Sequence, residues 1–155
     1  MPRWAAASLY MSEAQRRGYQ SSTDTSICWC LFDVLLGGYI EHRNGDKTTV
    51  HGTGHVRVGT AVSSSNVMKS GAHYAEFLIT GAPYIGIVRP MPGLDASAYQ
   101  EGVCSFTEYT NLFPDFRAQT SDEWGNDSVH ACEYYCKDGE MFWTNWDDKQ
   151  IEGVD

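Results

Sequence analysis

The sequence predicts an all-β protein built as an antiparallel β-sandwich. Several short runs alternate between apolar and polar residues, as strands with one buried face do. Clusters of turn residues separate these runs, and no segment shows the apolar repeat of a convincing long helix. With 155 residues, 42% of them hydrophobic, the chain is long enough for one domain with a substantial core.

The predicted strands begin near residue 48. The first two cover 48–51 and 55–62, and the third covers 72–80, where Ala75, Phe77 and Ile79 share one face. The nearly continuous apolar run 84–88 follows and ends before Pro90. Residues 129–137 and 141–144 then form a predicted hairpin, joined at Asp138-Gly139. Polar or acidic loops are expected at 93–101 and 107–128.

The N-terminal segment, residues 1–47, is expected to be irregular or partly helical and distinct from a sandwich at 48–155. Residues 1–20 fit a helical stripe only loosely. A linker-like run of Ser, Thr and Asp covers 21–26, and periodicity cannot assign the apolar stretch 27–36 to either helix or strand. Asn44-Gly45 is a strong signal for a hairpin turn.

The charge of the chain is negative and unevenly distributed. Eleven Lys and Arg stand against twenty Asp and Glu, giving a net charge of −9. Residues 1–78 carry seven bases and six acids, whereas residues 79–155 carry four bases and fourteen acids. Because this field repels phosphate backbones and anionic lipids, we expect neither nucleic acid nor a membrane as partner.

We find no secretory signal in the sequence and therefore predict an intracellular, cytoplasmic protein. The N-terminus lacks the long apolar core of a secretory signal, and the apolar run 27–40 is too short to span a bilayer. In that compartment the five cysteines are expected to be reduced. His130, Cys132 and Cys136 are the best candidate zinc ligands, but strung along one strand they do not converge on a point. We therefore expect no metal and no cofactor.

Catalytic motifs are missing from the sequence. It contains no Gly-x-Ser-x-Gly elbow and no glycine-rich phosphate loop. His51 and His55 have the spacing of a helical zinc motif, but the glycines between them favour a loop. The numerous carboxylates suit solvated loops, so we expect a protein that is not an enzyme.

Residues 70–77 (SGAHYAEF) followed by 84–88 (YIGIV) resemble the SPRY (B30.2-like) domain family. That family has a similar Ser-Gly-x-His-Tyr-Trp-Glu-Val strand and then an apolar strand with a glycine. The resemblance covers roughly residues 55–155. It implies a concanavalin-like sandwich that acts as a non-catalytic protein-interaction module and contacts its partner through loops.

Two features depart from the family pattern. Ala75 stands where the family has Trp, which removes a large core side chain. We also find no equivalent of the family's later Gly-Asp strand and final Asn-Gly hairpin, so the sandwich is expected to be incomplete. The chain is then a fragment, a divergent member or an incorrectly assembled sequence.

Two loops are the predicted contact sites for a protein or peptide partner with basic character. Arg89, Met91 and Asp95 lie in a proline-rich loop, and Asp122 and Trp124 place an aromatic anchor among acidic residues. The alternative is a lectin-like carbohydrate-binding module. Its candidate sugar-binding residues are Trp143, Asn145, Trp146 and Asp147.

Overall fold

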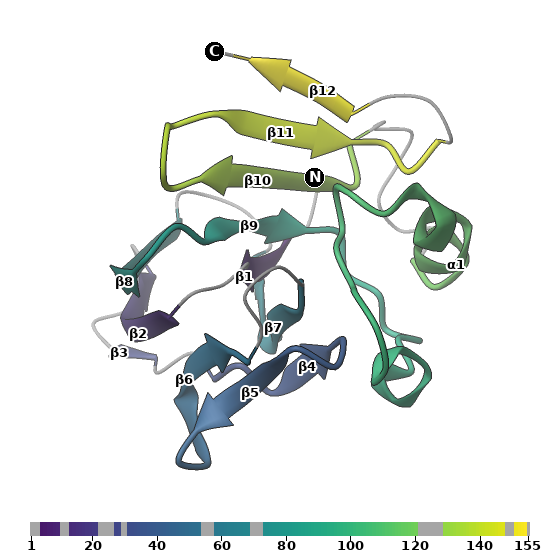
Figure 1. Ribbon diagram of the computed structural model, residues 1–155. Coiled ribbons are helices and arrows are strands. Elements are labelled where there is room, and N and C mark those ends of the chain that lie inside the picture. The colour runs from purple at the N-terminus through teal and green to yellow at the C-terminus, as the bar shows by residue number, and fades with distance from the viewer. Residues whose placement is uncertain are drawn as a thin grey trace.

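The structure is a computed structural model that describes residues 4–9, 13–21, 27–28, 31–53, 58–68, 73–120, 129–147 and 151–154. These residues form two antiparallel sheets with little helix, so the all-β prediction is confirmed (Figure 1). No helix in this part of the chain is long and apolar enough to cross a membrane.

The larger sheet, sheet A, has seven strands in the order β12-β11-β10-β9-β1-β7-β4. These are β1 (Trp4–Leu9), β4 (Val34–Leu36), β7 (Thr60–Met68), β9 (Tyr84–Val88), β10 (Ala131–Tyr135), β11 (Met141–Thr144) and β12 (Ile151–Val154).

The smaller sheet, sheet B, has β2 at its centre, paired with β8 along one edge and with β6 and β3 along the other, while β5 pairs with β6. Its strands are β2 (Glu13–Ser21), β3 (Ile27–Cys28), β5 (Ile40–Arg43), β6 (Asp46–Gly52) and β8 (His73–Thr80).

The expectation of an irregular or partly helical N-terminal segment is wrong for β1 and β2. β1 lies between β7 and β9 in sheet A, and β2 pairs with three strands of sheet B. Both sheets thus combine strands from either side of residue 47, so the strand order shows no boundary there. Pairing along both edges decides the conformation here, because strand formation depends more on neighbours than on intrinsic propensity.

The strand predictions in the middle of the chain are confirmed. β6 and β9 cover the predicted runs 48–51 and 84–88, β8 covers the described part of the run 72–80, and β10 and β11 form the predicted hairpin. The turn between β5 and β6 contains Asn44 and Gly45 with φ of 53° and 76°, as a two-residue hairpin turn requires. The predicted strand 55–62 begins later, since β7 starts at Thr60 and residues 54–57 lie outside the described ranges.

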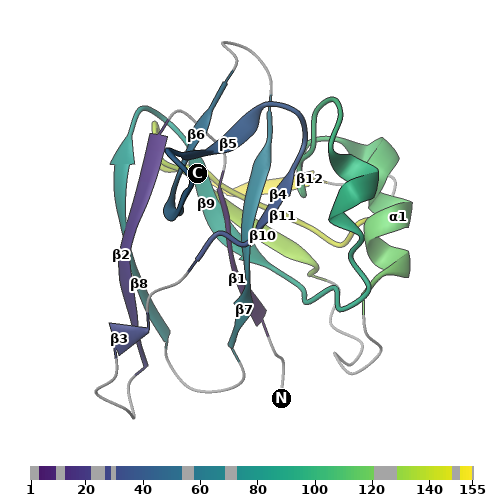
Figure 2. The ribbon, with the colours of Figure 1, turned by 90° about the horizontal axis from the view of Figure 1, so that it is seen from below.

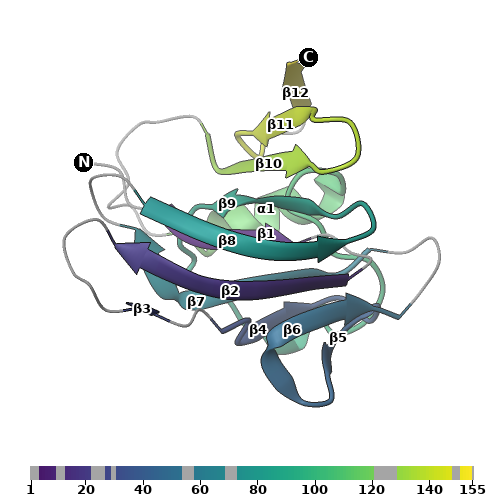
Figure 3. The ribbon, with the colours of Figure 1, turned by 90° about the vertical axis from the view of Figure 1, so that its left-hand side faces the viewer.

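One apolar cluster joins the two sheets. From sheet B, Ile40, Val50 and Phe77 pack against Ala61 and Ile85 of sheet A. Figure 3 shows β8 and β2 in front of β9, β1 and β7. The face of β8 that carries Phe77 is therefore the one turned toward sheet A.

A second apolar cluster lies on the opposite face of sheet A. It is covered by the segment that contains the short helices η1 (Ala96–Tyr99), η2 (Thr110–Leu112) and α1 (Phe113–Ala118), which Figure 2 shows beside the sheet. The prediction of plain loops here is wrong, because Phe113 and Phe116 are fully buried in this cluster. Pro114 at the start of α1 and Asp115 in its first turn favour a helix at this point.

Candidate functional site

Arg89, the first predicted partner-contact residue, is buried rather than displayed on a loop. Its side chain is 6% exposed. Its backbone N–H donates to the His130 carbonyl (2.7 Å), which continues the pairing of β9 with β10. The guanidinium Nη1 donates to His130 Nδ1 at 2.9 Å. Arg89 is therefore a structural group in this conformation, which corrects the expectation of a surface contact.

His130 is held between this guanidinium and an indole. Its ring lies parallel to that of Trp146, with centroids 5.0 Å apart. Because Nδ1 accepts from Arg89, the imidazole is neutral and carries its proton on Nε2. Burial, together with the charges of Arg89 and Arg117, lowers the pKa of His130 to about 4.

The other predicted contact residues have mixed positions. Met91 is half-buried and packs against the apolar cluster under α1. Asp95 is exposed and caps η1, where it accepts from the Ser97 amide (3.0 Å) and hydroxyl (2.6 Å); these bonds lower its carboxyl pKa. Asp122 and Trp124 fall in 121–128, outside the described residues. Of the three described members of the predicted loop set, only Asp95 is exposed.

The predicted sugar-binding set contains a buried member. Trp146 is only 2% exposed, and its indole N–H donates to the Phe106 carbonyl at 2.9 Å. Asn145 and Asp147 are tied to each other through their side chains, with Asn145 Nδ2 donating to Asp147 Oδ2 at 3.0 Å. A sugar could not stack on the Trp146 ring without displacing its packing.

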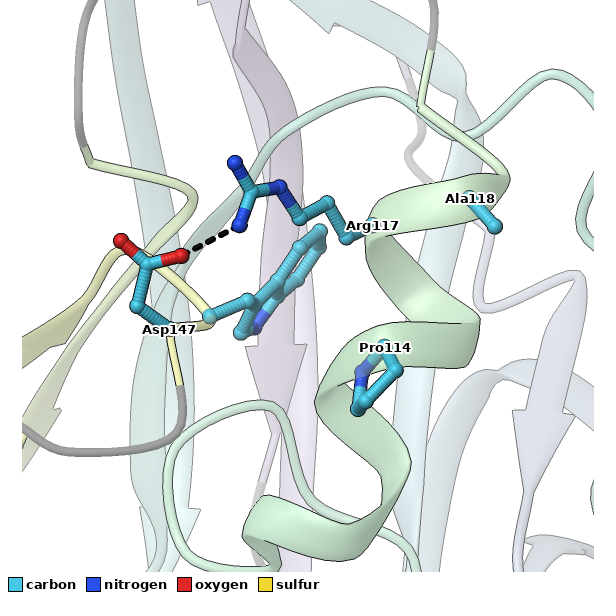
Figure 4. A pocket seen from close by; sticks show the side chains of 5 residues that line it. Pro114, Arg117, Ala118 and Asp147 are labelled. Carbon is cyan, nitrogen blue, oxygen red and sulfur yellow. Dashed lines mark hydrogen bonds and ion pairs between the residues drawn. The ribbon is translucent and has the colours of Figure 1, made fainter.

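An open pocket of about 430 Å³ lies where α1 meets the end of the hairpin (Figure 4). It is lined by Pro114, Arg117, Ala118, Trp146 and Asp147. The Arg117 guanidinium forms an ion pair with the Asp147 carboxylate at its rim, and both side chains are more than half exposed. Ligand sites usually enclose most of the ligand and direct several polar groups at it, so this pocket is a weak candidate.

Glu133 is a buried carboxylate inside sheet A, on the face beneath the helical segment. It is 1% exposed and accepts a hydrogen bond from the Thr107 hydroxyl. Its side chain lies over Gly86, where an added Cβ would be 2.9 Å from Glu133 Cγ. The backbone of β10 lies closer still, so Gly86 has no room for a side chain.

The cysteines and histidines considered as metal ligands were compared with the geometry that a metal ion requires. Within the described part of the chain, no group of three His, Cys, Asp or Glu could hold an ion. Burial raises the pKa values of the Cys132 and Cys136 thiols, which favours the protonated form. His51 Nε2 contacts Glu41 Oε1 at 3.0 Å across β5 and β6, whereas His55 lies outside the described residues.

The most conspicuous surface feature is an apolar face on the β10–β11 hairpin. It consists of Cys132, Tyr134, Met141 and Trp143, and we call it the β10–β11 face. Tyr134 lies directly opposite Met141, and Cys132 opposite Trp143, so all four side chains share one side of sheet A. Tyr134 and Met141 are 42% and 43% exposed, while Cys132 and Trp143 are half-buried.

This face continues the apolar cluster between the sheets. Tyr134 also lies opposite Ile85 of β9, which packs in that cluster. Sheet A extends beyond sheet B on this side, and in Figure 3 no described strand lies in front of β10 and β11. The sequence pattern places Cys132 and Tyr134 on one face. This pattern does not show where sheet B ends, and the end of sheet B determines whether these side chains are exposed.

Comparisons of the chain with protein-family models, with curated proteins and with solved structures found no match.

Proposed function

We propose that this chain is a non-catalytic protein-binding module with a SPRY-like, concanavalin-type sandwich fold. Two antiparallel sheets that share an apolar cluster support the sandwich. Of the residues behind the SPRY resemblance, 73–77 lie on β8 and 84–88 on β9, consecutive strands that belong to different sheets. Gly86 of β9 has a structural reason to be glycine, because an added Cβ would lie 2.1 Å from the Cys132 carbonyl oxygen of β10.

The β10–β11 face is the proposed binding surface, in place of the loops around Arg89. The observation that carries this proposal is the cross-strand pair of Tyr134 and Met141, both large, apolar and more than 40% exposed. Exposed apolar surface that continues a core is typical of interaction sites, and Tyr, Trp and Met are enriched at interfaces. A partner that covers this face removes its apolar surface from water.

The partner is expected to carry positive charge. Residues 79–155, which include β10 and β11, carry fourteen acids against four bases. Opposite charge on the partner accelerates its association, and this steering weakens as salt rises. The same field argues against nucleic acid and anionic membranes as partners, and we expect the protein to act in the cytoplasm.

The test is capture of partners by the whole chain and by two variants. Tyr134→Ser combined with Met141→Ser changes the proposed face, and Leu31→Ser is the control because Leu31 is 39% exposed and belongs to neither this face nor β8. We expect the double variant to retain about one-tenth or less of the proteins captured by the unmodified chain. Leu31→Ser should capture them normally. Equal capture by the double variant, with an unchanged melting temperature, would reject this face as the binding surface.

A further inference from the structure

The position of β8 relative to the β10–β11 face suggests how a partner is bound. β8 pairs with β2, and no other described strand pairs with it, so it forms an edge of sheet B. It is followed after three residues by β9 of sheet A, with Gly81 at φ +84° in the connection. β8 and β9 are therefore opposed across the two sheets at this end, as Figure 3 shows.

The strand after β9 in sheet A is β10. Neighbouring strands in both sheets are separated by about 4.8 Å, so a strand added outside β8 would lie over β10. Its inward side chains would meet Tyr134 and Met141, and its outward side chains would lie next to Glu76 and Leu78 of β8. Both Glu76 and Leu78 are exposed.

We propose that the partner contributes an extended segment, with alternating apolar and basic residues, that adds as a strand to the outer edge of β8. This inference rests on the proposed function and specifies the conformation and chemistry of the bound segment. Strand addition supplies affinity through main-chain hydrogen bonds, while alternate side chains supply specificity. The apolar residues would cover the β10–β11 face and extend the cluster between the sheets.

Charge favours a basic segment over a second copy of this chain. Glu76 is exposed on β8, and Asp138 and Glu140 are exposed in the turn between β10 and β11, where Lys137 is the one base beside them. Opposite charges on facing residues of neighbouring strands stabilise pairing, whereas like charges oppose it. Two copies would bring together chains that each carry a net charge of −9.

The test uses the full chain and a fluorescent peptide of sequence Lys-Val-Lys-Ile-Lys-Val-Lys, with binding followed by anisotropy. Two further peptides carry N-methyl groups on the Lys amides or on the Val and Ile amides. In a strand these two sets of amides point to opposite edges, so only one set can bond to β8. We expect one methylated peptide to bind at least about tenfold more weakly, while the other stays within about threefold of the parent.

Variants of the protein locate the peptide. Met141→Ser should weaken binding at least about fivefold, and Glu76→Lys should do the same and flatten the salt dependence. Glu101→Lys is the control for charge, because Glu101 is exposed in the loop after η1. It should change binding less than about twofold.

Each other outcome identifies which proposal fails. No binding by about 1 mM peptide, or equal tolerance of both methylated peptides, overturns strand addition at β8. If both methylated peptides bind equally well and Met141→Ser still weakens binding, the peptide uses the β10–β11 face without the edge of β8. The proposed function then stands. If the partner-capture test also shows no dependence on Tyr134 and Met141, the proposed function fails too. A dimer in sedimentation that Met141→Ser abolishes would identify a second copy as the occupant and overturn the basic segment.

Discussion

The imidazole of His130 lies flat on the indole of Trp146, with their planes 4° from parallel. On its other side the imidazole accepts a hydrogen bond from Arg89 Nη1. A neutral histidine can satisfy both neighbours, whereas an imidazolium would face the Arg89 guanidinium without a proton acceptor to offer. The stack therefore links the stability of the fold to pH.

We expect the fold to lose stability as the pH falls from 6.5 to 4. The pKa of His130 is lowered from 6.5 to about 4, so over this range the unfolded chain binds a proton that the folded chain does not. The loss should approach about 3 kcal/mol, since each pKa unit corresponds to about 1.4 kcal/mol. Urea unfolding at several pH values measures it.

His130→Gln is the matched variant, because the glutamine amide oxygen can still accept from Arg89 but the side chain does not titrate. Its stability at neutral pH can differ from that of the parent, and only its dependence on pH is compared. A variant that loses as much stability between pH 6.5 and 4 would assign the effect to other groups.

Gly86→Ala should destabilise the protein by about 3 kcal/mol. An added Cβ would lie 2.1 Å from the Cys132 carbonyl oxygen and 2.8 Å from Glu133 Cα, and backbone atoms cannot move aside cheaply. Gly93→Ala is the control, because nothing lies within 4 Å of its Cβ position. It should change stability by less than about 0.5 kcal/mol. Chemical unfolding compares the two, and a Gly86→Ala variant as stable as the control would contradict the close packing of β9 on β10.

Trp146→Phe should cost about 2 kcal/mol, whereas Trp143→Phe should cost less than about 1 kcal/mol. Trp146 is 2% exposed, and its replacement leaves the Phe106 carbonyl without its N–H donor. Trp143 is half-buried at the β10–β11 face. Thermal unfolding measures the loss of stability in each variant. A larger loss for Trp143→Phe than for Trp146→Phe would contradict the burial of Trp146 in the core.

Cys104 should resist alkylation in the native protein. It is 1% exposed, and burial, with a smaller contribution from Glu133, raises the pKa of its thiol to about 12. Iodoacetamide reacts with the thiolate, so at pH 8 we expect labelling at least about 100-fold slower than in the chain unfolded by guanidinium. Mass spectrometry of the peptide containing Cys104 gives the rate, and fast native labelling would show that this part of the core opens readily.

Much of the sheet structure could be predicted because local patterns encode it. The alternation around Ala75, Phe77 and Ile79 predicts the strand β8, and Asp138-Gly139 predicts the turn that pairs β10 with β11. Glycine and aspartate are preferred at such turns because of the backbone conformation of the two or three turn residues themselves. Such local patterns can be recognised in a single sequence.

The remaining elements depend on distant partners. The Ala-rich β1 and the polar β2 have weak strand propensity of their own, and pairing along both edges determines their conformation. The sequence predicts Arg89 as a partner contact because it lies in a proline-rich loop and arginine is enriched at interfaces. Its burial depends on His130, which lies 41 residues further along the chain. No local pattern reports such a pairing.

The placement of β1 between β7 and β9 has a consequence for the order of folding. β1 is synthesised before its two neighbours, which begin only at Thr60 and Tyr84. During synthesis, β1 therefore cannot pair along both of its edges until β9 has emerged from the ribosome. Contacts between segments so far apart in the sequence slow folding. A nascent chain would therefore depend most on a chaperone while β1 is still unpaired.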